Sequence, residues 1–378
     1  MFNFDLIVLG GGPAGFIASL IAQRNGARVA LLERSDFSIS RPGEHLSPDV
    51  IQKLRELAVW QPHESEYEEC CAIQSAWGNH ELIDKSFMLG PYGYGRNIDR
   101  STFDRINFQI AKEEGVYTVS DFSGSCRFKD VWQITGMANR RAFEFSAPVV
   151  FDATGRSAAI AKHVGSVSRR VNNLVGIQAI LKTKRTEERC NSATSLLIEA
   201  ACNGWWYALR VSDSAVIATY MTDADLYAQK GVGLRCFWYE RFKETIHVRN
   251  MIGGKLEILS DRVVPAFSRL LCPVHSAGYA AIGDAAMSID PLSSQGIANA
   301  IDTAILAEQS CRSGSLPNPS SDYSKTVADR FGNYIKQSHR FYSLEQRWQS
   351  SKFWRRRVTS PTLDTKNKQE GIYNAATI

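Results

Sequence analysis

The chain has 378 residues, which is enough for two or three domains with a large buried core. Its net charge of +5 is spread along the sequence, without the dense basic stripe of nucleic-acid-binding proteins. Apolar runs stay well short of the roughly 20 residues of a membrane span. The strand pattern starts close to Met1, so we expect no signal peptide. The eight cysteines show no metal-ligand spacing, so we expect reduced thiols, a cytoplasmic protein and no metal site.

The first elements of the chain predict a phosphate-binding turn. An apolar strand over residues 5–9 ends in a glycine-rich turn, and a helix follows over residues 16–25. Gly10 permits the sharp turn, Gly12 lets the backbone approach a pyrophosphate, and Gly15 lets the helix pack closely on the strand. The start of the helix then offers N–H groups to the phosphates.

A second strand, over residues 28–32, ends at Glu33. A carboxylate at this place can accept hydrogen bonds from the hydroxyl groups of an adenosine ribose. This order of elements predicts a dinucleotide site: a strand, a glycine-rich turn, a helix, and a second strand that ends in an acidic residue.

A later pair of motifs indicates which dinucleotide is bound. A short apolar strand that starts at Tyr279 ends in Gly283 and Asp284, and the stretch from Asp290 leads into a helix that begins near Gly296. The carboxylate is placed to meet the sugar-alcohol chain of a flavin. The positive end of the helix is directed at the ring edge where negative charge collects on reduction.

These motifs, together with a middle motif at Phe151–Ser157, resemble the FAD-binding domain of the p-hydroxybenzoate hydroxylase superfamily. The resemblance implies FAD as the cofactor and an α/β fold. In that fold a Rossmann-like FAD-binding domain is interleaved with an antiparallel β-sheet substrate domain and followed by a C-terminal helical segment. We expect the FAD-binding domain at 1–70, 98–165 and 265–312, the sheet domain at 71–97 and 170–264, the helical segment at 322–358 and a disordered tail at 359–378.

Three stretches distinguish the chain within that superfamily: Gly43–Pro48, Gly204–Tyr207 and Phe353–Arg357. Together they resemble the LodB/GoxB-type flavoproteins, over nearly the whole chain. The resemblance implies a monooxygenase that oxygenates a tryptophan side chain of a partner polypeptide, on which cysteine tryptophylquinone is then completed. The implied partner is the precursor of a quinone-cofactor amino-acid oxidase or amine dehydrogenase. NAD(P)H or a flavin-reducing partner is the implied electron source.

The motifs predict residues of a catalytic and substrate site and residues that bind FAD. Catalysis and proton movement are assigned to Glu199, His45 and Tyr207, and Trp205, Trp206, Tyr207 and Pro291 are expected to wall the substrate pocket. The expected FAD-binding residues are Gly10, Gly12, Pro13, Ala14, Gly15, Glu33, Arg34, Arg41, Glu44, His45, Arg100, Gly283, Asp284, Pro291, Gln295, Gly296 and Ile297.

Three other functions stay open at this point. A flavin-dependent halogenase is disfavoured because the family's Trp-x-Trp-x-Ile-Pro segment is absent, and because Lys85 lacks neighbours that match the family's catalytic lysine. A small-molecule aromatic hydroxylase and an FAD-containing assembly factor without turnover are the other two.

The end of the chain predicts a helix over about 341–357. We expect Phe341, Leu344 and Trp348 to pack inward and the arginines at 355–357 to face outward, because the apolar side chains carry far more area than a tail needs.

Overall fold

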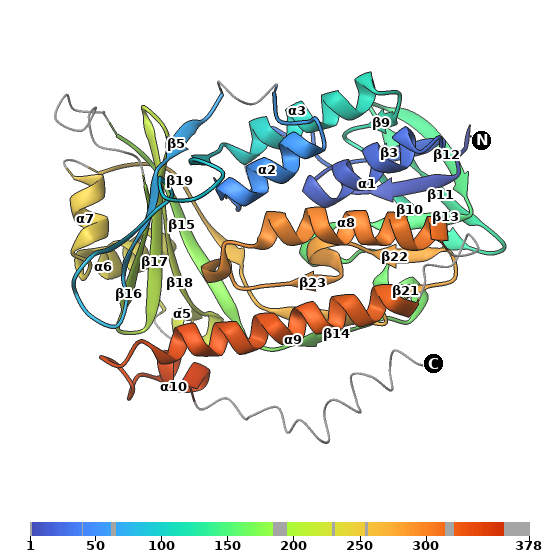
Figure 1. The fold of residues 1–378 in the computed structure, drawn as a ribbon. Coiled ribbons are helices and arrows are strands. Elements are labelled where there is room, and N and C mark those ends of the chain that lie inside the picture. The colour runs from blue at the N-terminus through green and yellow to red at the C-terminus, as the bar shows by residue number, and fades with distance from the viewer. Residues whose placement is uncertain are drawn as a thin grey trace.

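The computed structural model describes residues 2–39, 41–61, 66–183, 195–228, 231–253, 256–313 and 321–358. Figure 1 shows a layered part made of helices over a parallel sheet, and beside it a large sheet with helices of its own. The long helix α9 (Ser321–Ser343) runs beneath both parts. The predicted tail at 359–378 lies outside the described residues.

A six-stranded sheet forms the centre of the layered part. The sheet is parallel apart from β21, and its four central strands are largely buried because helices cover it. Its strands, in spatial order, are β21 (His275–Ser276), β22 (Tyr279–Ala281), β13 (Val149–Asp152), β2 (Leu6–Leu9), β3 (Val29–Leu32) and β9 (Tyr117–Val119). Its helices are α1 (Pro13–Arg24), α2 (Pro48–Glu56), α3 (Arg100–Glu113) and α8 (Gly296–Ser313).

Among the residues that the structure describes, three smaller sheets and the 3-10 helices η2 to η5 complete this part. The sheets are β1 (Phe2–Asn3), β12 (Arg141–Ala147), β11 (Trp132–Ala138) and β10 (Ser123–Phe128); β14 (Val167–Arg170), β20 (Arg269–Cys272) and β23 (Met287–Ser288); and β4 (His45–Leu46), β8 (Gly95–Asn97) and β5 (Glu68–Cys70). The 3-10 helices are η2 (Gly155–Ser157), η3 (Ala161–Val164), η4 (Gly283–Ala285) and η5 (Pro291–Ser293).

The large sheet has seven strands. In order they are β19 (Glu257–Pro265), β15 (Leu174–Lys182), β18 (Ala215–Asp223), β17 (Gly204–Ser212), β16 (Ser195–Ala201), β6 (Ala72–Ala76) and β7 (Ile83–Ser86). The expectation of an antiparallel sheet holds for every pair except β16 with β6, which is parallel. The short helices α5 (Ala224–Ala228), α6 (Leu234–Lys243) and α7 (His247–Ile252) follow β18.

The two faces of the large sheet bury different side chains. Trp205 and Tyr207 belong to a cluster that includes residues of α9 and α10 (Lys352–Val358). Trp206 points to the other face, where it packs against Trp238 and Phe242 of α6. The predicted alternation along β17 is therefore confirmed.

The prediction for the C-terminal segment is wrong in three respects. The segment forms two helices, because α9 ends at Ser343 and α10 begins at Lys352. Phe341 and Leu344 are 56% and 61% exposed, although Trp348 does pack against the cluster. The side chain of Arg357 is buried instead of exposed, and the carboxylate of Asp223 at the end of β18 binds it.

The predicted α/β fold is confirmed. Within the parts of the chain that the structure describes, no helix has the length and apolar character needed to cross a membrane.

Candidate functional site

The glycine-rich turn between β2 and α1 has the geometry of a phosphate cradle. Gly10 has φ +109°, and a Cβ at Gly15 would collide with the carbonyl oxygen of Gly10. At Gly12, no heavy atom of the described residues lies within 4 Å of the Cβ position, so the backbone there faces open space. Pro13 begins α1 without removing a needed N–H group. The turn therefore fits a pyrophosphate bound at the start of α1.

Glu33 lies buried at the end of β3, beside this turn. Its carboxylate accepts hydrogen bonds from the N–H of Gly11 (2.6 Å) and from Nη2 of Arg41 (2.6 Å). Burial acts to raise the pKa of Glu33, but Arg41 and the N–H groups of Ser35 and Gly11 outweigh it and lower the pKa. An ionised acceptor at this place fits an adenosine ribose. Arg34 is exposed.

The second flavin motif comes together around α8. Gly283 has φ +59° and packs close to Ala14 of α1. The side chain of Asp284 is 33% exposed and lies 3.3 Å from Nε of Arg156. Gln295 and Gly296 are exposed, so the start of this 18-residue helix is open to a ligand. An open helix start and a held carboxylate fit the flavin end of FAD.

Residues 42–46 form a tight segment, which we call the flavin loop. Gly43 has φ +106°, and a Cβ there would lie 2.6 Å from Nη1 of Arg100 and 3.9 Å from Cδ1 of Ile297. Nη1 of Arg100 donates to the carbonyl oxygen of Pro42 (2.6 Å), and Nη2 pairs with Asp104 (3.0 Å). Arg100 thus anchors the flavin loop against α3, and the loop lies beside the start of α8.

His45 is the member of this loop with a spare acceptor. Its Nδ1 lies 3.1 Å from Oδ1 of Asn97, and its ring stacks on Phe87 at a centroid distance of 6.1 Å. An acceptor opposite Nδ1 places the ring proton there, and Nε2 is buried with no protein partner among the described residues. Burial lowers the pKa of His45 to about 4, so the ring is neutral at pH 7.

This neutral histidine predicts a specific acid sensitivity. The folded pKa of about 4 is below the usual 6.5, so between these pH values the unfolded chain binds a proton that the folded chain does not. Between pH 7 and 4.5, we expect the free energy of unfolding to fall by on the order of 2 kcal/mol more in the wild type than in His45→Gln. Urea denaturation at several pH values measures this.

His163→Gln, at an exposed position, is the control for the loss of a histidine. Parallel pH profiles for the wild type and His45→Gln would contradict a buried neutral imidazole.

Glu44 carries the main polar contact between the flavin loop and the large sheet. Its Oε1 accepts from Nε2 of Gln178 (2.8 Å), and its Oε2 accepts from the N–H of Gly43 (2.9 Å) and from Oη of Tyr207 (3.3 Å). Burial and the charge of Glu44 raise the pKa of Tyr207, so its phenol keeps the proton. The structure thus brings Glu44, His45 and Tyr207 into one region.

Glu199 and Trp206 need correction as site residues. Glu199 lies on the other face of the large sheet, and its carboxylate accepts from the N–H groups of Ile246 (2.7 Å), His247 (3.0 Å) and Val248 (2.8 Å). It therefore caps the start of α7 and is not placed to move a proton at the flavin. Trp206 is core between the sheet and α6.

Trp205 has a structural partner instead of an open pocket. Its Nε1 donates to Oη of Tyr342 (3.0 Å), and that hydroxyl donates to Oδ2 of Asp290 (2.6 Å). Asp290 also caps η5 through the N–H of Leu292 (2.9 Å), so this chain of bonds fixes the half-buried Pro291 before α8. Trp205 is buried and supports the segment that leads into the flavin site.

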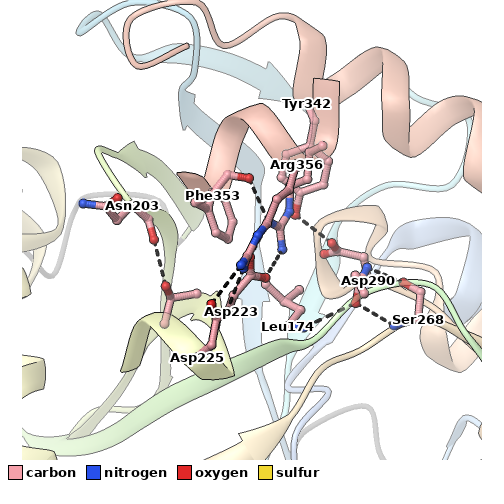
Figure 2. A network of polar contacts seen from close by, with 12 residues as sticks. Leu174, Asn203, Asp223, Asp225, Ser268, Asp290, Tyr342, Phe353 and Arg356 are labelled. Carbon is pink, nitrogen blue, oxygen red and sulfur yellow. Dashed lines mark hydrogen bonds and ion pairs between the residues drawn. The ribbon is translucent and has the colours of Figure 1, made fainter. Parts of the chain in front are cut away.

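Figure 2 shows how α10 is attached next to this chain of bonds. Nη1 of Arg356 binds Asp223 (2.7 Å) and Asp225 (2.7 Å), and Nη2 of Arg357 binds Asp223 (2.8 Å). The guanidinium of Arg357 also lies over the ring of Phe353 at 3.5 Å. The C-terminal segment is therefore part of the frame around the site.

Sequence reasoning missed Gln178, Asn97 and Tyr342. The available signal was a polar residue inside an apolar strand, as at Gln178 within Leu174–Lys182, since a buried amide requires a partner. Nothing in the local sequence identifies that partner as Glu44.

Comparisons with known proteins agree with this site. A family model described as FAD dependent oxidoreductase matches residues 5–38, and one described as Tryptophan halogenase matches residues 62–376. LodB of Marinomonas mediterranea, a protein named as an FAD-dependent oxidoreductase, is 28% identical over 94% of this chain and 97% of its own length. A tryptophan 2-halogenase of Chondromyces crocatus is 24% identical over 82% of this chain and 61% of its own length.

Solved structures share the fold. The flavin-dependent halogenase CmlS superposes with a TM-score of 0.83 at 21% identity, covering 100% of this chain and 72% of that one. The peptidyl tryptophan dihydroxylase QhpG, described as essential for tryptophylquinone cofactor biogenesis, gives a TM-score of 0.76 at 20% identity, covering 94% and 78%. With the FAD cradle described above, the matches lead to one conclusion: the chain belongs to the tryptophan halogenase family and is an FAD-dependent oxidoreductase.

Proposed function

We propose that this chain is a monooxygenase that oxygenates a tryptophan side chain in the precursor of a quinone-cofactor amino-acid oxidase or amine dehydrogenase. The observation that carries the proposal is the match to LodB, which spans 94% of this chain and 97% of that protein. The shared fold of the peptidyl tryptophan dihydroxylase QhpG supports the same reaction class. Reduction by NAD(P)H or by a flavin-reducing partner, and a cytoplasmic site of action, complete the proposal.

The chemistry divides between cofactor and protein. Bound FAD, once reduced, supplies electrons that activate O₂ toward an electron-rich indole ring. The residues of this chain hold the cofactor and exclude water. Gly12 and the start of α1 would hold the pyrophosphate, Glu33 would bind the ribose, and the open start of α8 would receive the ring.

One group in the flavin loop, the imidazole of His45, is assigned to proton contacts. Nε2 of the neutral His45 is an acceptor without a protein partner among the described residues, so it can accept a hydrogen bond from a reacting group. The carboxylate of Glu44 is already engaged by three uncharged donors and serves to fix the loop. The neutral phenol of Tyr207 is one of these donors.

Halogenation is the second candidate, because the chain belongs to the tryptophan halogenase family. Against it stands Lys85, the nearest equivalent of the halogenase lysine, which lies exposed on the edge strand β7. Small-molecule hydroxylation and a non-catalytic assembly role are further outcomes of the test below.

Co-expression with an oxidase precursor encoded beside this chain tests the proposal. We expect mass spectrometry of the precursor to find one or more added oxygen atoms on a single tryptophan, and none when this chain is omitted. A halogen on that residue would identify a halogenase. An unmodified precursor, with oxygen added instead to a free aromatic compound, would identify a small-molecule hydroxylase.

A further inference from the structure

Four polar side chains lie in a straight line across the large sheet. Arg262 is paired in register with Gln178, Gln178 with Thr219, and Thr219 with Tyr207, on the neighbouring strands β19, β15, β18 and β17. The neighbouring side chains on this face are mostly apolar, and Gln178 is only 1% exposed. A polar row at such a place is costly unless its groups bind a partner.

The partner of this row is Glu44 from the flavin loop. Nε of Arg262 donates to Oε1 of Gln178 (2.9 Å), which fixes the orientation of the amide group. Nε2 of Gln178 is therefore the end that faces Glu44, to which it donates at 2.8 Å. Oη of Tyr207 donates to the other carboxylate oxygen at 3.3 Å. Both oxygens of a buried carboxylate are thus held by the large sheet.

Glu44 connects this contact to the cofactor site. It follows Gly43, which packs beside Ile297 at the start of α8, and its own carbonyl oxygen accepts from the N–H of Ile98 (2.8 Å). The contact to the carboxylate therefore holds a residue whose backbone lies next to the start of α8, where the flavin ring would bind. Hydrogen bonds to a charged group are among the strongest in proteins, so the contact is suited to fix a loop.

We propose that Gln178 and Tyr207 are positioning residues that clamp Glu44, and so keep the flavin loop in register with the sheet that carries the substrate. The part that concerns substrate rests on the proposed function. The clamp itself rests on the contacts between the sheet and the flavin loop. Arg262 acts through Gln178 by holding its amide in the donating orientation.

The test compares Gln178→Glu with a matched control, Gln74→Glu, on strand β6 of the same sheet. The first change replaces a donor by a second carboxylate facing Glu44. The control substitution, Gln74→Glu, keeps an oxygen that accepts the hydrogen bond from the hydroxyl of Ser195. In the FAD-free protein, we expect amide hydrogen exchange over residues 43–46 and at Ile98 to accelerate about tenfold in Gln178→Glu only. The dissociation constant for FAD is expected to rise about tenfold in the same variant.

Tyr207→Phe provides a milder second variant, which removes one hydroxyl and keeps the ring. We expect amide hydrogen exchange over residues 43–46 to accelerate about threefold. Exchange and FAD affinity that are unchanged in both variants would overturn the clamp, and equal changes in Gln74→Glu would overturn its specificity. Neither readout needs the partner protein. If the loop is loosened in these variants and the wild type leaves the precursor without added oxygen, the proposed function is refuted and the clamp still stands.

Discussion

Gly12→Val is expected to abolish FAD binding while the protein stays folded. The Cβ position of Gly12 faces open space with nothing described within 4 Å, at the place where the backbone meets the pyrophosphate. Valine methyl groups would fill that space and separate the phosphates from the N–H groups of α1. Hydrogen bonds to the charged phosphates would be lost, and the valine methyl groups would clash with the cofactor. Together these effects predict an affinity for FAD that is lower by roughly 100-fold or more. Titration of the FAD-free protein with FAD, followed by flavin fluorescence, measures it.

Gly233→Val is the matched control for this experiment. Gly233 also caps a helix, α6, has φ −62°, and likewise has no described atom within 4 Å of its Cβ position. We expect its affinity for FAD to equal that of the wild type. Tight FAD binding by Gly12→Val would contradict the assignment of the glycine turn. A mature partner formed by FAD-free Gly12→Val would instead indicate an assembly factor.

Asp223→Ala is expected to destabilise the protein by about 3–5 kcal/mol, because it leaves the buried cation of Arg357 without its carboxylate. Asp223 is buried, and Nη2 of Arg357 lies 2.8 Å from its Oδ1. The side chain of Arg357 is itself only 8% exposed. Urea denaturation of the FAD-saturated protein measures the loss.

Asp225→Ala removes a neighbouring acid that binds Arg356 and Lys352, with a side chain that is 38% exposed. Exposed ion pairs contribute little, so a loss of at most about 1 kcal/mol is expected. Similar losses in the two variants would show that burial of Arg357 does not anchor α10.

Local patterns predicted the elements around the expected FAD site, while the FAD-binding residues themselves stay a prediction. The glycine turn, the acid at Glu33 and the helix that begins at Gly296 depend on residues close in sequence, whose φ angles and helix ends follow from chain geometry. The alternation of Trp205 and Trp206 was likewise a local property of one strand. The predicted domain boundaries stay a prediction.

Long-range partners decided the rest. Glu199 caps a helix that begins 48 residues later, at His247. The residues around Glu199 do not predict a contact with that helix. Arg357 is buried because Asp223, 134 residues earlier, neutralises it. The contact of Gln178 with Glu44 also joins distant parts of the chain, separated by 134 residues. Such contacts depend on how sheets and helices pack in the tertiary structure, and the local spacing of residues does not predict that packing.

The most direct test of oxygenation uses ¹⁸O₂ with the purified, FAD-loaded protein, a reductant and the unmodified precursor. The account predicts ¹⁸O on one tryptophan of the precursor, dependent on this chain and lost with Gly12→Val. Reduced protein that consumes ¹⁸O₂ but leaves every tryptophan of the precursor unlabelled would contradict it.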